Sequence, residues 1–187
     1  MSPSSLPPPG KSTFPFWRSN LHALDDHRST PELPSRTDIV IIGAGYAGAS
    51  TAYHILQLCK QKPLPVPSIT ILEARQVCSG ATGRNGGHLK PDPYSRPSAV
   101  AATHGIEAAR ELSEFEASHV PAVKKLVEEE NIDCDFVLTR RVDAFLADSI
   151  YAAMKGGVDL LRENKVSVMD DVFFASSAQA EQVYLLT

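Results

Sequence analysis

The sequence predicts an α/β fold built around one β-α-β unit, and three segments carry this prediction. Residues 38–42 (DIVII) form an apolar run rich in β-branched side chains, which is typical of a buried strand. Residues 46–59 are compatible with a helix, and residues 68–73 (SITILE) form a second strand after a proline-broken loop at 60–67. Because two parallel strands need a crossover connection, the helix supplies the link between them.

Three glycines stand between the first strand and the helix, in the spacing Gly43-x-Gly45-x-x-Gly48. This is the physical layout of a dinucleotide site. Gly43 permits the tight turn, Gly45 lets the backbone approach a pyrophosphate, and Gly48 lets the helix pack close to the strand. The N-terminus of the helix then presents free N–H groups and a partial positive charge to the phosphates. Taken alone, the motif fits either NAD or FAD.

Glu73 ends the second strand. An acidic residue at this place accepts hydrogen bonds from the ribose hydroxyls of an adenosine and repels a 2′-phosphate, which disfavours a phosphorylated dinucleotide. The usual spacing from the glycines is about 20 residues, and the proline loop at 60–67 accounts for the longer spacing here. The alternative interpretation is a solvated carboxylate at the end of a strand.

A glycine-rich segment follows at residues 79–88, with the sequence SGATGRNGGH. Four glycines mixed with Ser, Thr and Asn predict a loop rich in exposed backbone, which can wrap a ligand and offer N–H groups to it. Arg84 can reach a phosphate or a carboxylate. A generic flexible loop is the alternative. Its position just after the second strand places it at the same edge as the glycine turn, which favours a binding role.

The second half of the sequence is predicted to be mostly helical. We expect a loop at 91–97 and then a long helix over about 103–130, bent by Pro121. One apolar stripe defines this helix. Its members are Ala108, Leu112, Phe115, His119, Val123 and Leu126. The histidine of the stripe is interpreted as a half-buried or hydrogen-bonded residue and not as a ligand.

Shorter elements are expected after this helix. Residues 135–139 and 142–146 each read as a short strand, and residues 150–164 read as a helix. Ser176 and Gln179 have the spacing of a capping box for a last helix that starts near residue 177.

Residues 1–36 are predicted to form a proline-rich, extended leader, which holds seven of the fourteen prolines. Three aromatic side chains interrupt its polar character: Phe14, Phe16 and Trp17. We expect them to dock on the folded body as an anchor. A sticky patch on a loose arm is the alternative.

The composition of the chain narrows its partners and its compartment. With a hydrophobic content of 43% and a net charge of −4, the chain fits one globular domain, and neither nucleic acid nor an anionic membrane is expected as a partner. Residues 39–59 carry no charge unless His54 is protonated, but their strong hydrophobes are concentrated in the first four positions, so no membrane span is expected. The three cysteines lie far apart and outside zinc spacings, which predicts no metal and a reducing, cytoplasmic location.

Three motifs together carry a family resemblance: IVIIGAGYAGASTAYHI, ILEA and SGATGRNGGH. They resemble the FAD-dependent amino acid and amine oxidoreductases of the D-amino acid oxidase superfamily, in the branch with sarcosine-oxidase-like and glutamylputrescine-oxidase-like members. The resemblance implies a Rossmann-like FAD-binding domain over residues 37–187, with added helices and the start of a substrate domain. It also implies oxidation of the C–N bond of an amino acid or secondary amine by hydride transfer to the flavin.

The resemblance also implies which residues contact FAD. The glycine turn would hold the pyrophosphate, the end of the second strand would bind the adenosine ribose, and the glycine-rich loop would line the flavin and pyrophosphate. In this sequence these positions are Gly43, Ala44, Gly45, Tyr46, Ala47, Gly48, Glu73, Ala74, Arg75, Ala81, Thr82, Gly83, Arg84, Asn85, Gly86, Gly87 and His88. Some relatives attach flavin through a histidine in this loop, where Arg84 stands here, so noncovalent FAD is expected. No catalytic residue is assigned.

Members of this superfamily are roughly two to three times as long, so the sequence resembles the N-terminal portion of such an enzyme. We therefore expect a small amine or amino acid as substrate and the C-terminal half of the same enzyme as a missing partner. Two other interpretations stay open. One is a noncatalytic, truncated FAD- or nucleotide-binding fragment, so that enzyme activity of this chain is an open question. The other is an NAD-dependent Rossmann dehydrogenase, against which the loop at 79–88 argues.

Overall fold

The computed structural model describes residues 13–176, 178 and 179. These residues form two compact units, and the boundary between them lies between Gly87 and His88. The predicted boundary after residue 36 stays a prediction. Residues 1–12 of the predicted leader and residues 177 and 180–187 of the predicted last helix lie outside the described residues.

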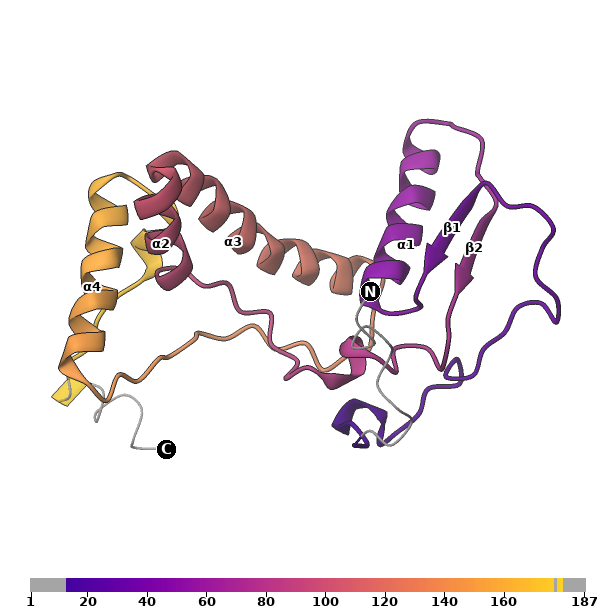
Figure 1. The fold of residues 1–187 in the computed structure, drawn as a ribbon, viewed down its shortest axis with the longest axis horizontal. Helices are drawn as coiled ribbons and strands as arrows, with labels where there is room; N and C mark the ends of the chain where they lie inside the picture. The colour runs from indigo at the N-terminus through magenta and orange to yellow at the C-terminus, as the bar shows by residue number, and fades with distance from the viewer. Residues whose placement is uncertain (1–12, 177, 180–187) are drawn as a thin grey trace, which may run out of the picture. The chain divides into compact units, whose positions relative to one another are not determined.

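The first unit is a small parallel sheet with one helix (Figure 1). Strand β1 (Ile39–Ile42) pairs in parallel with strand β2 (Ile69–Leu72), and helix α1 (Tyr46–Gln61) connects them. Two short 3-10 helices complete the unit, η2 (Phe16–Arg18) before the sheet and η3 (Ala81–Arg84) after it. The predicted β-α-β unit is therefore confirmed, with each element within two residues of its expected bounds.

Strand β1 has one partly covered face and one exposed face. The side chain of Ile41 lies on the face that α1 covers, because its Cγ2 atom approaches the helix at Gly48. Val40 and Ile42 point the other way, and 52% and 87% of their surface is exposed. This alternation follows from the two-residue period of a strand. The first unit consequently has little core of its own.

A side-chain tie fixes the start of the two strands. The Asp38 carboxylate accepts hydrogen bonds from the Ser68 backbone amide at 2.9 Å and from its hydroxyl at 2.7 Å. The Ser68 hydroxyl also accepts one from the Asp38 amide at 2.9 Å. The bonds from Ser68 lower the pKa of Asp38 below its ordinary value. This tie sets the register in which Ile39 faces Ile69.

The second unit is helical (Figure 1). It contains the larger core. Helix α2 (Ser95–His104) packs against α3 (Ile106–Glu129) and α4 (Asp148–Glu163), and the 3-10 helix η4 (Ser167–Asp171) packs against α3 and α4. Residues of α3, α4 and η4, together with the residues just before α2 and η4, form one buried apolar cluster. The cluster comprises Tyr94, Ala109, Val158, Leu161, Val166 and Met169.

Helix α2 corrects the prediction of a loop over 91–97. The prediction took Pro97 as a sign of a loop. A proline is tolerated in the first turn of a helix, because the amides of that turn have no hydrogen-bond partner within the helix. The carboxylate of Asp92 accepts hydrogen bonds from the amides of Ser95 and Arg96 and so caps the first turn. The predicted long helix also begins later, at Ile106, because the chain turns a corner at Gly105.

The two strands predicted at 135–139 and 142–146 are wrong, because both segments are irregular in the structure. Side chains hold this stretch in place: the Arg141 guanidinium donates to the Pro91 carbonyl oxygen at 2.9 Å, and Arg140 pairs with Asp171 at 2.6 Å. The predicted apolar stripe is also partly wrong, because 64% of the Phe115 surface is exposed.

The capping box is confirmed at the last described turn. The Ser176 amide and hydroxyl donate to the Gln179 side-chain oxygen, and the Gln179 amide donates back to the Ser176 hydroxyl at 3.3 Å. Across the described part of the chain, each helix is too short or too polar to cross a membrane.

Candidate functional site

The glycine turn between β1 and α1 has the geometry that its sequence predicts. Gly43 adopts a φ of +101°, a region that favours glycine, and its amide donates to the Leu72 carbonyl oxygen at 2.7 Å. A Cβ atom on Gly48 would lie well inside 3.0 Å of the Gly43 carbonyl oxygen, closer than real side chains approach. The N-terminus of α1 therefore packs directly on the turn, as a close backbone approach requires.

The glycine-rich loop reaches the N-terminus of α1. The Thr82 hydroxyl, on η3, accepts a hydrogen bond from the Tyr46 amide at 3.0 Å. The helix has Gly45 at its N-cap and no side-chain bond from that residue, so Thr82 takes the place of a capping side chain. Two motifs that are far apart in the sequence thus meet at the end of the helix that faces away from the proline loop.

Glu73 joins the second strand to the same turn. One carboxylate oxygen accepts the Ala44 amide at 2.8 Å, and the other accepts the Arg75 amide at 3.0 Å. The bond from Ala44 is the main reason that the pKa of Glu73 lies below its ordinary value, although partial burial opposes it. The carboxylate is therefore ionised at neutral pH. Since each of its oxygens has a further lone pair, it can accept two more hydrogen bonds, which suits a pair of neighbouring hydroxyls.

Cys78 lies just before the glycine-rich loop in the sequence, where it was interpreted as a buried or incidental thiol, and the structure links it to the glycine turn. Its amide donates to the Ala44 carbonyl oxygen at 3.0 Å, with the backbone at a φ of +56°. Burial, and then the negative charge of Glu73, raise the pKa of the Cys78 thiol. The residue therefore acts as a link between the loop and the turn and stays protonated. The thiol donates to the same carbonyl oxygen at 3.6 Å, so both the backbone and the side chain of Cys78 contact the turn.

The predicted cofactor residues fall into two groups in the structure. The glycine turn, the end of β2 and the loop through Gly87 lie in the first unit, with direct contacts between all three segments. His88 is exposed and begins the second unit. The expected aromatic anchor in the leader is confirmed only for Trp17, whose indole N–H donates to the Asn85 carbonyl oxygen at 2.7 Å. Phe14 and Phe16 are exposed, so the prediction that they dock is wrong.

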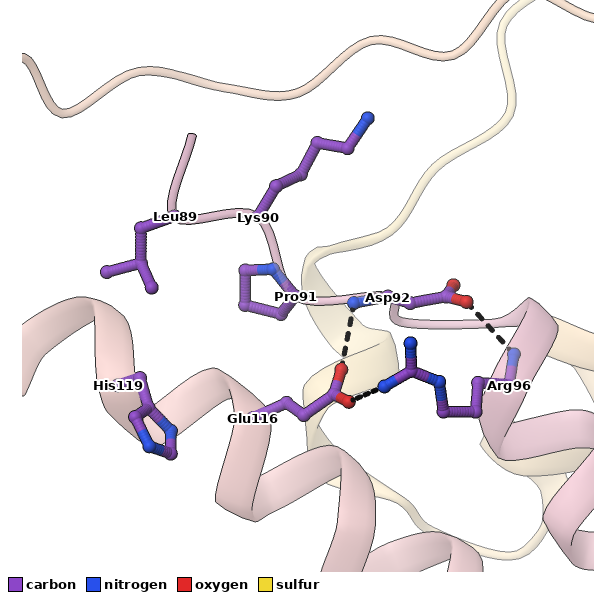
Figure 2. A pocket seen from close by; sticks show the side chains of 7 residues that line it. All are labelled: Leu89, Lys90, Pro91, Asp92, Arg96, Glu116 and His119. Carbon is purple, nitrogen blue, oxygen red and sulfur yellow. Dashed lines mark hydrogen bonds and ion pairs between the residues drawn. The ribbon is translucent and has the colours of Figure 1, made fainter. Parts of the chain in front are cut away.

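The second unit has an open hollow beside α2 and α3, lined by both apolar and charged side chains (Figure 2). Glu116 lies at its centre, where it accepts the Asp92 amide at 3.1 Å and pairs with Arg96 at 2.5 Å. These contacts join α3 to the start of α2. The imidazole of His119 contacts the Phe115 carbonyl oxygen at 2.7 Å, so the predicted hydrogen-bonded histidine is confirmed. The hollow is therefore a junction between helices, and none of its lining residues was predicted to bind the cofactor.

A family model described as FAD dependent oxidoreductase (DAO) matches residues 38–177. The chain belongs to the DAO family of FAD-dependent oxidoreductases. This assignment agrees with the resemblance inferred from the three motifs. It covers both compact units and leaves the leader before residue 38 outside the match.

Two curated relatives of this DAO-family chain are similar in sequence. Gamma-glutamylputrescine oxidoreductase of Escherichia coli (strain K12) is 30% identical over 100 residues, which is 53% of this chain and 22% of that protein. YhfW of Bacillus subtilis (strain 168), provisionally named as a Rieske 2Fe-2S iron-sulfur protein, is 26% identical over 133 residues, or 70% of this chain and 23% of that protein. The matches thus span less than a quarter of each relative. No solved structure matches the chain significantly.

Proposed function

We propose that the first unit binds FAD noncovalently, in a Rossmann-like arrangement, and that it serves an oxidation of the C–N bond of a small amine or amino acid. The observation that carries this proposal is the position of the ionised Glu73 carboxylate on the amide of Ala44 in the glycine turn. An acid at the end of the second strand is the element that distinguishes a dinucleotide site from a simple glycine turn. The family match and the name of the E. coli relative support the cofactor and the amine substrate.

Each segment of the site has a binding role in this proposal. The amides at the start of α1 and the partial positive charge of its N-terminus favour the pyrophosphate. Glu73 accepts the two ribose hydroxyls through its remaining lone pairs. The glycine-rich loop supplies backbone N–H groups beside the flavin, and Arg84 contributes a positive charge. Bound FAD supplies the hydride-accepting chemistry, and these residues orient it.

The substrate-facing residues are proposed to lie outside the described site, in sequence equivalent to the rest of the longer relatives. A noncatalytic FAD-binding piece is the second candidate function, because the matches span less than a quarter of each relative. We further propose a cytoplasmic location on the basis of the three free cysteines, Cys59, Cys78 and Cys134.

A titration of the purified chain with FAD and, separately, with NAD tests the binding proposal. Flavin fluorescence and the visible flavin spectrum report FAD binding. Substitution Glu73→Gln removes the charge that accepts the ribose hydroxyls and should raise the Kd for FAD by about tenfold, or about 1.4 kcal/mol. The exposed Glu111→Gln is the matched control and should leave the Kd unchanged. Binding of NAD without FAD, or an unchanged Kd in Glu73→Gln, would contradict the proposal.

A further inference from the structure

A segment of the leader lies across the glycine-rich loop of the first unit. This segment, residues 13–26, is called the N-terminal strap here. It precedes the part of the chain that the family model matches, which starts at residue 38. It folds locally through η2 and a turn in which the Asp25 amide donates to the His22 carbonyl oxygen at 2.9 Å. The strap is therefore an ordered addition to the family's common region.

Trp17 attaches the strap to the C-terminal part of the glycine-rich loop. Its indole N–H donates to the Asn85 carbonyl oxygen at 2.7 Å. Its ring lies so close to Gly87 that a Cβ atom there would stand 2.6 Å from the ring carbon Cζ2. Glycine at this position thus leaves room for the ring. Although 51% of the Trp17 surface stays exposed, the polar atom and one edge of the indole are committed to the loop.

Arg18 attaches the strap to Val77, just before the glycine-rich loop. Its guanidinium pairs with both carboxylate oxygens of Asp25, at 2.6 and 3.0 Å, and donates to the Val77 carbonyl oxygen at 3.1 Å. The Val77 amide in turn donates to the Asp25 carbonyl oxygen at 3.0 Å. Only 14% and 12% of the Arg18 and Asp25 side chains is exposed, so this pair is screened less by water than the surface ion pairs. Arg84 adds a third bond, to the Thr13 carbonyl oxygen at 2.9 Å.

The strap acts on a loop that is otherwise costly to order. Four glycines in residues 79–88 give the unfolded loop a high conformational entropy. The same loop carries Thr82, whose hydroxyl accepts the first amide of α1. Contacts at Val77, Arg84, Asn85 and Gly87 therefore bracket the residue that meets the helix.

We propose that the N-terminal strap holds the glycine-rich loop in its binding conformation, and that Trp17 and Arg18 are positioning residues for the FAD site. This inference rests on the proposed function of the first unit. Because the strap orders the loop before the cofactor binds, the loop loses less conformational entropy on binding. This raises the affinity for FAD without any contact between the strap and FAD. Breaking the strap's contacts should weaken FAD binding and expose the loop.

Two readouts test this proposal on the full 187-residue chain, with Trp17→Ala as the main variant. The first is the Kd for FAD, which should rise about tenfold or more. The second needs no cofactor: limited trypsin cleavage after Arg84 should become several-fold faster. Phe14→Ala is the matched control, because this strap aromatic is 71% exposed, and it should leave both values unchanged.

Arg18→Ala tests the other end of the strap and allows a third readout. Trp17 is the single tryptophan of the chain, so its fluorescence reports directly on its contact with the glycine-rich loop. In Arg18→Ala the emission should shift to the red and iodide should quench it more strongly. If Trp17→Ala does not fold, Trp17→Phe, which keeps an apolar ring and loses the bond to Asn85, takes its place with a smaller effect in the same direction.

The outcomes separate the strap from the cofactor site. A wild-type Kd together with a wild-type rate of cleavage after Arg84 in Trp17→Ala would overturn the proposal. If the wild-type chain binds no FAD, the proposed function of the unit fails, and the cleavage rate decides alone: faster cleavage in the variant supports a strap that holds the loop, and equal cleavage refutes it.

Discussion

The contact between Gly48 and the turn before it leads to a quantitative prediction. A glycine-to-alanine change inside a helix ordinarily stabilises by about 1 kcal/mol. In Gly48→Ala the new Cβ atom meets the Gly43 carbonyl oxygen and, at 3.3 Å, the Cγ2 atom of Ile41. Because the nearest neighbour is backbone, α1 must move away from the turn, which places the cost near the upper end of about 1–3 kcal/mol for overpacking. The net loss of stability is about 2 kcal/mol.

The displaced helix should also weaken cofactor binding. If the same free energy is lost from the bound state, about 2 kcal/mol raises the Kd for FAD about 30-fold. Urea unfolding followed by Trp17 fluorescence measures the stability of the first unit, and a flavin titration measures the Kd. The control is Ala49→Ser, which adds one atom at an exposed position of the same helix and should change stability by less than about 0.5 kcal/mol. Wild-type stability and Kd in Gly48→Ala would refute the close-packing argument.

Three further predictions concern the remaining features. Gly157→Ala should destabilise the helical unit, because its Cβ would collide with Ser98, whereas the neighbouring Gly156→Ala, with open space around it, should stabilise it by about 1 kcal/mol in thermal unfolding. The pKa of Glu73 lies below its ordinary 4.5, so its carboxylate stabilises the folded chain above that pH, and this stabilisation is lost as the pH falls through the lowered pKa. Glu73→Gln should make the acid decline in stability smaller, and the part that remains comes from other carboxylates with lowered pKa, such as Asp38. Burial, with the hydrogen bond to Asp143, raises the pKa of Tyr94 to about 12, so one tyrosine should ionise near pH 12 in an absorbance titration. The stability that this group contributes should be lost between pH 10 and 12. Tyr94→Phe should abolish the ionisation near pH 12 and cost about 1–2 kcal/mol of stability.

The parts of the fold that the sequence predicted depend on local patterns. The β-branched run before Gly43 and the strand that ends at Glu73 each carry their own signal, and the connecting helix forces them to be parallel. The capping box of Ser176 and Gln179 is likewise written in two residues three positions apart. The segments predicted to form the candidate site contact one another in the first unit, and each was recognisable because it has an unusual local composition.

The parts that could not be predicted depend on contacts between distant residues. Residues 135–146 have strand-like composition, but a strand exists only where another strand pairs with it, and the structure instead holds this stretch by arginine side chains. Asp92 caps α2 from outside the helix, so Pro97 misleadingly suggested a loop. The link from Cys78 to the glycine turn joins residues 34 positions apart, and no local pattern predicts which distant carbonyl oxygen the amide and the thiol contact.

The exposed face of the small sheet has a consequence for the chain during its synthesis. In the described residues β1 and β2 pair only with each other, so each strand has one outer side with unpaired backbone groups. Val40 and Ile42 add an exposed apolar surface on β1, beside its free edge. Such a surface recruits strands from neighbouring molecules. Newly made chains at high concentration should therefore associate through this sheet, and the yield of monomer should improve when expression is slow and cold.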